Sequence, residues 1–193
     1  MISKEKEIKS VWILGSTSQV AQSICIELAK KGCKEFFLLA RNKSKNKQFS
    51  SNLRRKYKVL VEERYIDLES FNFSKDKNAP QVSNCDLYII TAGFLGNNDL
   101  AKKDFYEAKK IIDVNFTSII AWINVITTYE RLNKRSALWI FTSVAADRGR
   151  PSNYFYGAAK SGLQIFSEGL ISRCFKKKLS VRVIKAGYMD TPM

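Results

Sequence analysis

Short apolar runs alternate along this chain with longer segments whose apolar residues recur at helical spacing. The apolar runs are rich in β-branched and aromatic residues, and they cover residues 11–14, 36–40, 59–61, 87–91, 138–142 and 181–184. Runs of this length are typical of strands that are buried on both faces of a sheet. Strands that alternate with helices predict a doubly wound α/β fold with a parallel sheet.

Three helical stripes lie between the runs. The first joins Val20, Ile24 and Leu28, and Gly32 follows where a helix is expected to end in a left-handed glycine. The other two stripes precede the fifth and sixth runs; they consist of Ile112, Ile119, Ile123 and Ile126, and of Ala159, Leu163, Phe166 and Leu170. Because no linker or repeat interrupts the 193 residues, the sequence predicts one domain, residues 1–193.

Composition excludes several kinds of catalysis. The chain has no histidine and four scattered cysteines, so we expect no metal site and no Ser-His or Cys-His nucleophile. The first ten residues are charged and lack an apolar signal core, and the longest apolar run, 119–126, is too short to span a bilayer. Together with the scattered cysteines, these features predict a reduced, cytoplasmic setting.

The formal net charge of +15 raises the question of an anionic partner. The densest basic segment, 41–58, has eight cations and no acid, and it is predicted to be a loop followed by a surface helix. Nucleic acid or an anionic membrane surface would suit such a segment. Aromatic residues do not interleave with the cations, however, as a base-stacking platform requires. We therefore expect a solvated basic surface and no nucleic acid partner, with peripheral association with a membrane surface as the alternative.

The turn after the first run is the first candidate for ligand binding. In a dinucleotide-binding fold this turn holds a pyrophosphate through backbone N–H groups at a helix N-terminus. The usual three glycines are reduced here to Gly15, with Gln19 and Ala21 in the other two places. The Gln19 side chain either pushes the phosphates out or lies aside and donates a hydrogen bond. A plain N-cap cluster of Ser and Thr is an equally good interpretation. The candidate contacts in this turn are Gly15, Ser16, Thr17, Ser18, Gln19 and Val20.

The end of the second run bears on the choice of dinucleotide. An acid there would bind the ribose 2′-hydroxyl of NAD, whereas this chain has Arg41 followed by Asn42. A guanidinium suits a 2′-phosphate, so the sequence predicts NADP(H) in preference to NAD(H), with Arg41 and Asn42 among the contacts. The alternative is that Arg41 merely opens a basic surface helix.

Two Tyr-x-x-x-Lys pairs, Tyr106–Lys110 and Tyr156–Lys160, are candidates for acid–base chemistry. On a helix this spacing puts both side chains on one face. A cation beside a phenol lowers the pKa of the phenol, which then exchanges a proton with a substrate more readily. With 8 tyrosines and 23 lysines in the chain, about one such pair is expected by chance. The spacing alone therefore does not decide between them.

Taken together, these segments resemble the short-chain dehydrogenase/reductase family over nearly the whole chain, which implies a Rossmann fold. The glycine turn is degenerate, but the order and spacing of the other motifs are specific. These motifs are Asp67-Leu68 after the third run, Thr91-Ala92-Gly93 where the family has Asn-Ala-Gly, Asn115 in the following helix, Thr142-Ser143 at the end of the fifth run, Tyr156 with Lys160, and Ala186-Gly187 through Asp190-Thr191 where the family has Pro-Gly…Thr.

The resemblance selects one of the two tyrosines. The family's catalytic serine stands thirteen residues before its tyrosine, and this chain has Ser143 at that distance from Tyr156. Gly93 takes the same place relative to Tyr106, so we expect Tyr106 and Lys110 to be surface residues of a helix.

The resemblance also implies hydride transfer between a nicotinamide and a carbonyl or secondary alcohol. Tyr156 would be the general acid in reduction, and Ser143 would hydrogen-bond the carbonyl oxygen. Lys160 would hold the nicotinamide ribose and lower the pKa of Tyr156, while Asn115 would hold a water that extends a proton relay. The cofactor contacts implied beyond the glycine turn and Arg41-Asn42 are Asp67, Leu68, Ala92, Gly93, Tyr156, Lys160, Gly187, Met189 and Thr191.

The substrate is suggested by a narrower resemblance. Residues 147–160 resemble a subset of bacterial members that act in cell-envelope polysaccharide synthesis, including the keto-reductase that completes epimerisation of a decaprenylphosphoryl pentose. This implies a keto-sugar substrate, with Arg148 or Arg150 as a hypothetical contact for its phosphate. A surface salt bridge, for example with Asp147, is the alternative.

Two further expectations concern the chain as a whole. Family members continue beyond the sixth strand, so we expect this strand to be an exposed sheet edge in a truncated chain, and the full-length protein to be a homo-oligomer. The departures at Gln19, Thr91 and Ala186 suggest the alternative function, a non-catalytic cofactor-binding sensor or scaffold.

Overall fold

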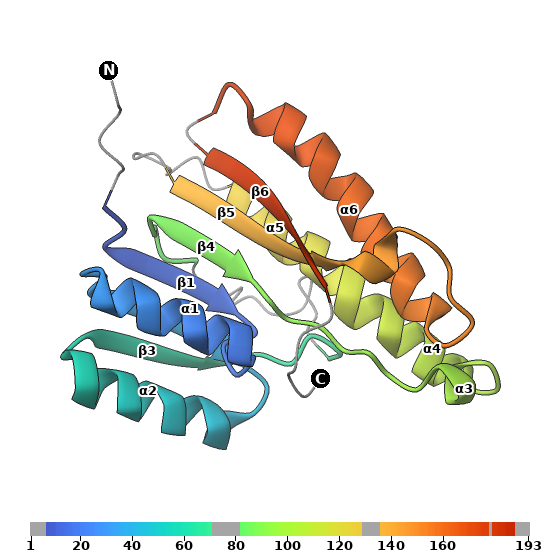
Figure 1. Cartoon of the computed structure of the whole chain (residues 1–193), viewed down its shortest axis with the longest axis horizontal. Coiled ribbons are helices and arrows are strands. Elements are labelled where there is room, and N and C mark those ends of the chain that lie inside the picture. Colours follow the sequence, from blue (N-terminus) through green and yellow to red (C-terminus); the bar gives the residue numbers. More distant parts are fainter. Residues whose placement is uncertain (1–6, 71–81, 129–135, 178, 188–193) are drawn as a thin grey trace.

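The computed structural model describes residues 7–70, 82–128, 136–177 and 179–187. In this part of the chain, parallel strands form one six-stranded sheet in the order β3-β2-β1-β4-β5-β6, and helices cover both of its faces (Figure 1). The strands are β1 (Ser10–Leu14), β2 (Glu35–Ala40), β3 (Leu60–Tyr65), β4 (Leu87–Ile90), β5 (Ser136–Ser143) and β6 (Leu179–Ala186). The predicted doubly wound α/β fold is confirmed.

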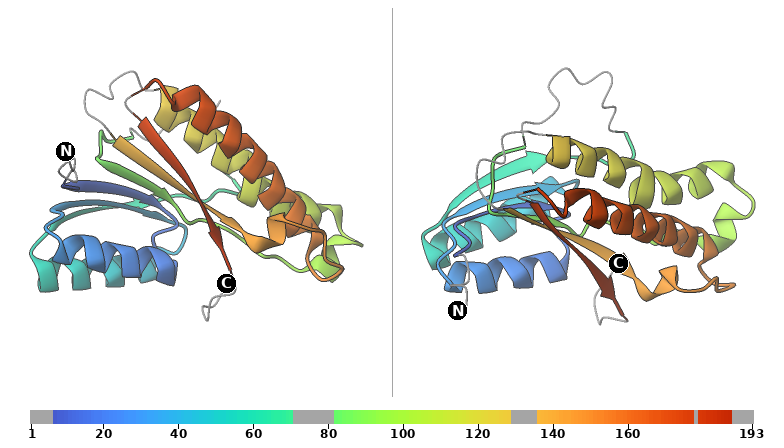
Figure 2. Two further views of the ribbon diagram at one scale, coloured as in Figure 1. Left: turned by 45° about the horizontal axis from the view of Figure 1, so that its top comes forward. Right: turned by 90° about the horizontal axis from the view of Figure 1, so that it is seen from above.

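The helices divide between the two faces of the sheet. Helices α1 (Gln19–Lys30) and α2 (Lys43–Tyr57) lie on one face, whereas α5 (Ser118–Thr128) and α6 (Tyr154–Cys174) lie on the other (Figure 2). The remaining short elements lie between strands; they are α3 (Asn98–Ala101), α4 (Phe105–Ile112), a π-helical turn (Asp113–Thr117) that joins α4 to α5, and a 3-10 helix (Val144–Ala146) after β5.

Burial follows the position of each strand in the sheet. Strands β1 and β4 are buried at every position, while the edge strands β3 and β6 carry exposed residues. One apolar core lies between the sheet and α5 and α6, where the rings of Trp12 and Trp122 are 5.5 Å apart. A second core lies between the sheet and α1 and α2. Near-continuous apolar runs therefore mark the strands in the middle of the sheet. Among the described residues, β6 is an edge strand.

Two helical stripes differ from the prediction. The buried face of α1 includes Ala21 and Cys25, while Val20 and Ile24 are only half-buried, so the face is turned by one residue. Small side chains on that face let the helix approach β1 closely. The stripe from Ile112 to Ile126 is not one regular helix, because the π-helical turn interrupts it.

Two other local predictions are confirmed. Gly32 has a φ of +94° directly after α1, and the N–H of Cys33 donates to the Leu28 carbonyl at 2.9 Å, which is the helix end that a left-handed glycine provides. The basic segment 41–58 forms helix α2, whose first residues are capped by Asn42.

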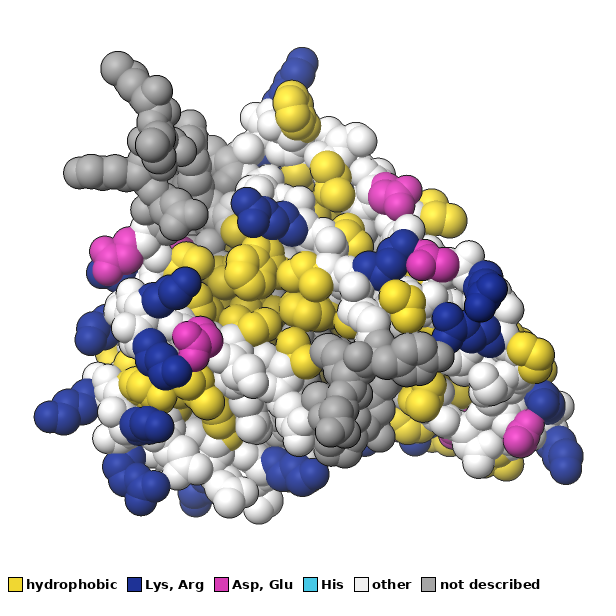
Figure 3. Space-filling model, viewed as in Figure 1, with side chains coloured by type: hydrophobic (Ala, Val, Ile, Leu, Met, Phe, Trp, Pro, Cys, Tyr) yellow, Lys and Arg dark blue, Asp and Glu magenta, His cyan; other side chains and the backbone are white. Residues whose placement is uncertain are grey.

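Cations are spread over the face that Figure 3 shows, and apolar side chains gather near its centre, where the sheet is not covered by α1 or α2. Ala137, Trp139 and Phe141 of β5 are partly buried apolar residues that pack against the core on the α1 and α2 side of the sheet. One helical run, Phe105–Thr127, is long and apolar enough to cross a membrane by length and composition, with half of its most apolar window buried in the protein. A core helix has the same properties, so this run is weak evidence for a membrane segment.

Candidate active site

A pocket of about 440 Å³ opens at the carboxyl ends of the strands, where the strand order reverses between β1 and β4. Ligands of open α/β sheets bind at such a switch point. Most of the predicted site residues line it; they are Gly15, Thr17, Ser18, Gln19, Val20, Arg41, Asn42, Asp67, Leu68, Ala92, Gly93, Ser143, Tyr156, Lys160 and Gly187. Ser16 and Asn115 do not line it, and Met189 and Thr191 lie outside the described residues.

The turn after β1 depends on Gly15. Its φ is +93°, and a Cβ atom there would lie 2.5 Å from the backbone nitrogen of Ala92. Only glycine fits this conformation and this approach. The Thr91 hydroxyl lies 3.2 Å from the Leu14 carbonyl and 3.1 Å from the Gly15 carbonyl, so it ties the end of β4 to the turn. Thr91, which replaces the asparagine of the family motif, therefore forms hydrogen bonds with the turn itself.

The three hydroxyl residues of the turn have different partners. Ser16 is fully buried and donates to Asn46 Oδ1 at 2.8 Å, and Asn46 in turn donates to the Leu38 carbonyl. The Ser16 hydroxyl therefore points into the interior, and its predicted contact with the cofactor stays a prediction. Ser18 accepts a hydrogen bond from Ala21 N–H at 3.4 Å and caps α1. Thr17 lines the pocket.

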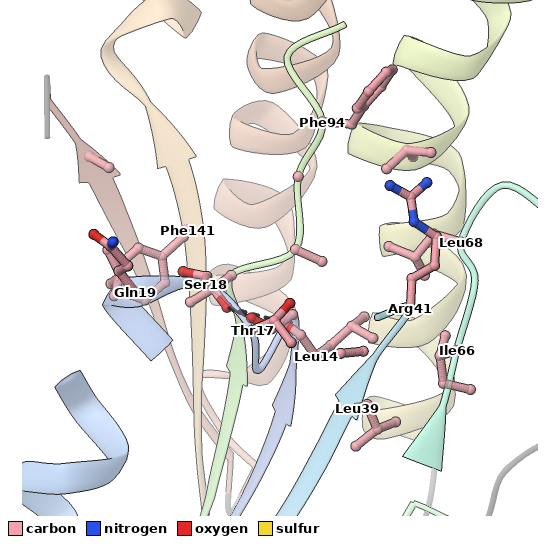
Figure 4. A pocket seen from close by; sticks show the side chains of 18 of the residues that line it. Leu14, Thr17, Ser18, Gln19, Leu39, Arg41, Ile66, Leu68, Phe94 and Phe141 are labelled. Carbon is pink, nitrogen blue, oxygen red and sulfur yellow. Dashed lines mark hydrogen bonds between the residues drawn. The ribbon is translucent and has the colours of Figure 1, made fainter. Parts of the chain in front are cut away.

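Gln19 is the first residue of α1, and its side chain is exposed. It lines the pocket on the side away from Arg41 (Figure 4). The side chain therefore lies at the rim, which fits the second of the two alternatives for this residue, a side chain that lies aside.

The other end of the pocket is cationic. Arg41 projects from the end of β2 toward Leu68 (Figure 4), and Lys45 on α2 also lines the pocket. Asn42 Oδ1 accepts a hydrogen bond from Lys45 N–H at 2.9 Å, so the Asn42 side chain caps α2. The first turn of α2 contains no acid. Sequence reasoning missed Lys45; its position three residues after an N-cap asparagine was the available signal.

The loop after β3 closes this end of the pocket. Asp67 Oδ1 accepts a hydrogen bond from Glu69 N–H at 3.1 Å, which fixes the bend of the loop. The Ser118 hydroxyl of α5 donates to the Leu68 carbonyl at 2.6 Å. The two predicted residues, Asp67 and Leu68, are thus held in place by the loop itself and by α5.

The Ser143, Tyr156 and Lys160 side chains meet at the opposite end. Ser143 ends β5, and its Oγ accepts a hydrogen bond from Ala145 N–H at 3.1 Å and is hydrogen-bonded to Tyr156. Gly157 makes this contact possible, because a Cβ there would lie 2.8 Å from the Ala145 carbonyl oxygen. Helix α6 can therefore bring Tyr156 against the end of β5.

Burial controls the pKa values of this cluster. Burial raises the pKa of Tyr156, and the hydrogen bond with Ser143 partly opposes that shift. Lys160 is 3% exposed, and burial lowers its pKa from 10.5 to about 8. Its Nζ lies 3.4 Å from the Phe141 carbonyl oxygen and 5.8 Å from the centre of the Tyr156 ring. The net shift of the Tyr156 pKa in this structure is therefore upward, through burial, and the lowering expected from Lys160 stays a prediction.

Asn115 lies behind the pocket in the π-helical turn and is fully buried. Its Oδ1 accepts from Phe94 N–H at 3.0 Å, and its Nδ2 donates to the carbonyls of Phe94 at 2.6 Å and Ile111 at 2.8 Å. A Cβ on Gly93 would lie 3.2 Å from Asn115 Oδ1 and 3.6 Å from Lys160 Nζ. The segment after β4 therefore passes close to both the Asn115 amide and the Lys160 ammonium, and the protein occupies both amide N–H groups and one lone pair of the Asn115 side chain.

The second Tyr-Lys pair lies elsewhere. Tyr106 is 63% exposed on α4, and neither Tyr106 nor Lys110 lines the pocket. Tyr154 is also exposed, and its ring stacks on Phe155 with centroids 4.6 Å apart. The choice of Tyr156 from the sequence agrees with this geometry.

The pocket fits a nicotinamide dinucleotide. It has a glycine turn at a helix N-terminus, two cations at one end and a hydroxyl-lysine cluster at the other. The buried hydroxyl of Thr142, which also lines it, has no hydrogen-bond partner in the structure. Such orphaned groups are rare in native proteins and are satisfied by a ligand or water. Among the described residues no cluster of metal-ligating side chains occurs.

Known proteins resemble the chain over most of its length. The family model for short chain dehydrogenase matches residues 9–193. An uncharacterized oxidoreductase of Mycobacterium tuberculosis is 25% identical over 182 residues, which are 93% of this chain and 72% of the relative. A 3-oxoacyl-[acyl-carrier-protein] reductase of Haemophilus influenzae is 25% identical over 186 residues, 96% of this chain and 76% of the relative.

The fold recurs in solved structures. A short-chain dehydrogenase from Sphingobium yanoikuyae, solved in complex with NADPH, has a TM-score of 0.83 at 20% identity and covers 94% of this chain and 72% of its own. With the family model matching almost the whole chain and the fold shared, the protein belongs to the short-chain dehydrogenase family and is an NAD(P)-dependent oxidoreductase.

Proposed function

We propose that the protein is an NADP(H)-dependent oxidoreductase that interconverts a carbonyl and a secondary alcohol. One observation carries this proposal: the hydrogen-bonded hydroxyls of Ser143 and Tyr156 and the buried Lys160 share one pocket with the cations of Arg41 and Lys45. A single dinucleotide can reach from one group to the other.

The residues that would hold the cofactor follow from their places in the pocket. The turn from Gly15 to Val20 would bind the pyrophosphate, without the Ser16 side chain. Asp67 and Leu68 would contact the adenine, and Ala92, Gly93 and Lys160 the nicotinamide half. Gly187, at the end of β6, leaves open space on that side. Met189 and Thr191, which lie outside the described residues, would hold the carboxamide, as the family resemblance implies. When bound, the nicotinamide supplies or accepts the hydride.

Tyr156 would move the proton. Because burial raises its pKa, the phenol is protonated at neutral pH and can donate to a carbonyl oxygen during reduction. Ser143 would hydrogen-bond the same oxygen and stabilise the negative charge that develops there. In the oxidation direction Tyr156 would first give up its own proton, and the phenolate would then take the proton from the alcohol while Ser143 hydrogen-bonds the same oxygen.

Lys160 would stabilise the phenolate that forms when Tyr156 gives up its proton. With a pKa of about 8 it is mostly cationic at neutral pH, and its low-dielectric surroundings strengthen its field. We retain the proposed water relay at Asn115. Both N–H groups of the side-chain amide are occupied, so the remaining lone pair of Oδ1 or the backbone of the π-helical turn would bind the water.

The preference for NADP(H) would come from Arg41 and Lys45. Both side chains line the adenine end of the pocket. The first turn of α2, which contains Lys45, has no acidic residue that could form an ion pair with it. A doubly charged 2′-phosphate gains from both cations, whereas a hydroxyl does not. Relatives in fold solved with NADPH or NADP support this choice.

For the substrate we propose a keto-sugar of envelope polysaccharide synthesis, on the resemblance of residues 147–160. Arg148 is exposed and Arg150 half-buried on this segment, while Asp147 forms its ion pair with Lys185 of β6. A phosphate on the substrate would contact one of the arginines. The four cysteines are buried thiols, in keeping with the cytoplasmic location that we also propose.

A side-by-side titration of the purified protein with NADPH and NADH, followed by tryptophan fluorescence, tests the proposal. We expect tighter binding of NADPH, and then NADPH oxidation in a screen of keto-sugars and simple ketones. Binding without any turnover would favour the non-catalytic alternative, and a folded protein that binds neither dinucleotide would contradict the proposal.

A further inference from the structure

Glu69 joins the loop after β3 to helix α4. Its Oε1 accepts a hydrogen bond from the Tyr106 hydroxyl, and its Oε2 lies 2.9 Å from Lys110 Nζ. Both partners belong to the second Tyr-x-x-x-Lys pair, in which the helical spacing puts the phenol and the ammonium on one face. The pair that plays no part in the pocket chemistry thus binds one carboxylate together.

This contact is less exposed than several other ion pairs of the protein. The Lys110 and Glu69 side chains are each 21% exposed, while each of the pairs Lys30–Glu27, Arg54–Glu63 and Lys109–Asp113 has a side chain that is 43% exposed or more. Lys110 Nζ also lies 5.1 Å from the ring centre of Phe94, which lines the pocket. Exposed ion pairs contribute little to stability. The Glu69 carboxylate is partly buried and binds both a phenol and an ammonium that lies near an aromatic ring, so this contact holds the two segments together more firmly than an exposed pair does.

The contact fixes a loop that the cofactor would touch. Glu69 directly follows Asp67 and Leu68, which line the pocket, and the Ser118 hydroxyl holds the Leu68 carbonyl at 2.6 Å. The loop is therefore fastened at two consecutive residues to the helical run from α4 to α5. If the Glu69 contact were lost, only the hydrogen bond from the Ser118 hydroxyl to the Leu68 carbonyl, of these two contacts, would still hold the loop.

Glu69 also lies close enough to Arg41 to interact with it electrostatically. The hydrogen bonds from Tyr106 and Lys110 are the main causes that lower the pKa of Glu69, and the charge of Arg41 adds to them. Without Lys110, the Glu69 charge would be compensated less and would attract Arg41 and repel an anionic ligand.

We propose that Tyr106 and Lys110 are positioning residues for the adenine end of the cofactor, which they serve by holding and neutralising Glu69. The inference rests on the proposed function, because it assigns the adenine and the 2′-phosphate to this end of the pocket. It adds two effects: the loop at Asp67 and Leu68 keeps its shape, and Arg41 stays available for the phosphate.

The variant Lys110→Met tests it against the control Lys109→Met. Lys109 is the neighbouring residue on α4, and it is 60% exposed and pairs with Asp113. For Lys110→Met we expect NADH binding to weaken about threefold and NADPH binding about tenfold, whereas Lys109→Met binds both as the wild type does. The double variant Glu69→Gln with Lys110→Met also removes the negative charge of Glu69 that Lys110 no longer neutralises, so we expect the preference for NADPH to return.

Hydrogen exchange of the amides at residues 66–69 in the free protein separates this inference from the proposed function. We expect faster exchange in Lys110→Met than in Lys109→Met, whether or not any dinucleotide binds. Wild-type protein that binds neither dinucleotide would contradict the proposed function. Unchanged exchange in Lys110→Met, or dinucleotide affinities equal to those of the control, would overturn the role of Lys110 and Tyr106.

Discussion

The side-chain amide of Asn115 and the backbone of Phe94 hold each other through two hydrogen bonds, of 3.0 Å from Phe94 N–H and 2.6 Å to its carbonyl. This pairing fixes the segment after β4 at the point where it passes Lys160. These bonds explain why the polar Asn115 stands in the middle of an apolar helical run. Its side chain pairs with backbone groups of the segment after β4, which have no strand partner outside the sheet.

Asn115→Ala removes three hydrogen bonds and leaves buried backbone groups unpaired. We expect a loss of about 2–4 kcal/mol in the free energy of unfolding, measured by urea denaturation. Asn124→Ala, at an exposed position of α5, is the control and should change it by less than about 0.5 kcal/mol. Equal effects of the two substitutions would show that the contacts of Asn115 carry no stability.

Gly15→Ala places a Cβ 2.5 Å from the Ala92 nitrogen at a positive φ. We expect a loss of at least about 2 kcal/mol in the free energy of unfolding, together with loss of dinucleotide binding. Gly169→Ala is the matched control, because Gly169 is exposed in α6 with nothing near its Cβ position. That change should stabilise the protein by about 0.5–1 kcal/mol. A Gly15→Ala protein as stable as the wild type would contradict the geometry of the turn.

Lys160 should make stability depend on pH. Burial lowers its folded-state pKa from 10.5 to about 8, so between these values the unfolded chain binds a proton that the folded chain does not. The contribution of Lys160 to the free energy of unfolding therefore rises with pH in that window, and the full penalty for burying the charge persists below it. Lys160→Met removes the penalty, so we expect the variant to be more stable by on the order of 3 kcal/mol near pH 7.

That advantage should shrink as the pH rises toward about 10, which urea denaturation of both proteins across the range would show. A stability difference that does not change with pH would mean that Lys160 does not titrate in this window. Enzymatic activity should be lost in Lys160→Met at every pH, because the cation that stabilises the phenolate is gone.

Arg41→Met and Lys45→Met should each weaken NADPH binding about tenfold or more and leave NADH binding unchanged, because each removes a charged contact to the 2′-phosphate only. Isothermal titration of each variant with both dinucleotides gives the two affinities. Lys47→Met is the control, since Lys47 is exposed on the same helix and does not line the pocket. A parallel loss of NADH binding in Arg41→Met would assign Arg41 to the adenine or ribose instead.

The fold could be predicted because its central strands are apolar along their whole length and its turns carry local signals such as Gly15 and Gly32. Tyr156 could be selected because the chain resembles a family whose serine stands thirteen residues before its tyrosine, as Ser143 does here. The direction of the Ser16 hydroxyl could not, since it depends on Asn46 of another helix.

Long-range burial limits prediction in the same way at two other places. The pKa of Tyr156 follows from the loss of solvent around the ring, which no spacing of residues reports. The partner of Tyr106 and Lys110 is Glu69, some 40 positions away in the chain, so the sequence favoured a plain surface pair.

The central claim, that Tyr156 is the proton donor in a pocket that binds NADPH, is tested most directly by Tyr156→Phe. The substitution keeps the ring and removes only the hydroxyl that meets Ser143. NADPH affinity and NADPH-dependent carbonyl reduction would be measured on the same protein preparation. We predict affinity close to that of the wild type and turnover reduced by roughly 10²–10⁴-fold. Wild-type turnover by Tyr156→Phe would contradict the claim.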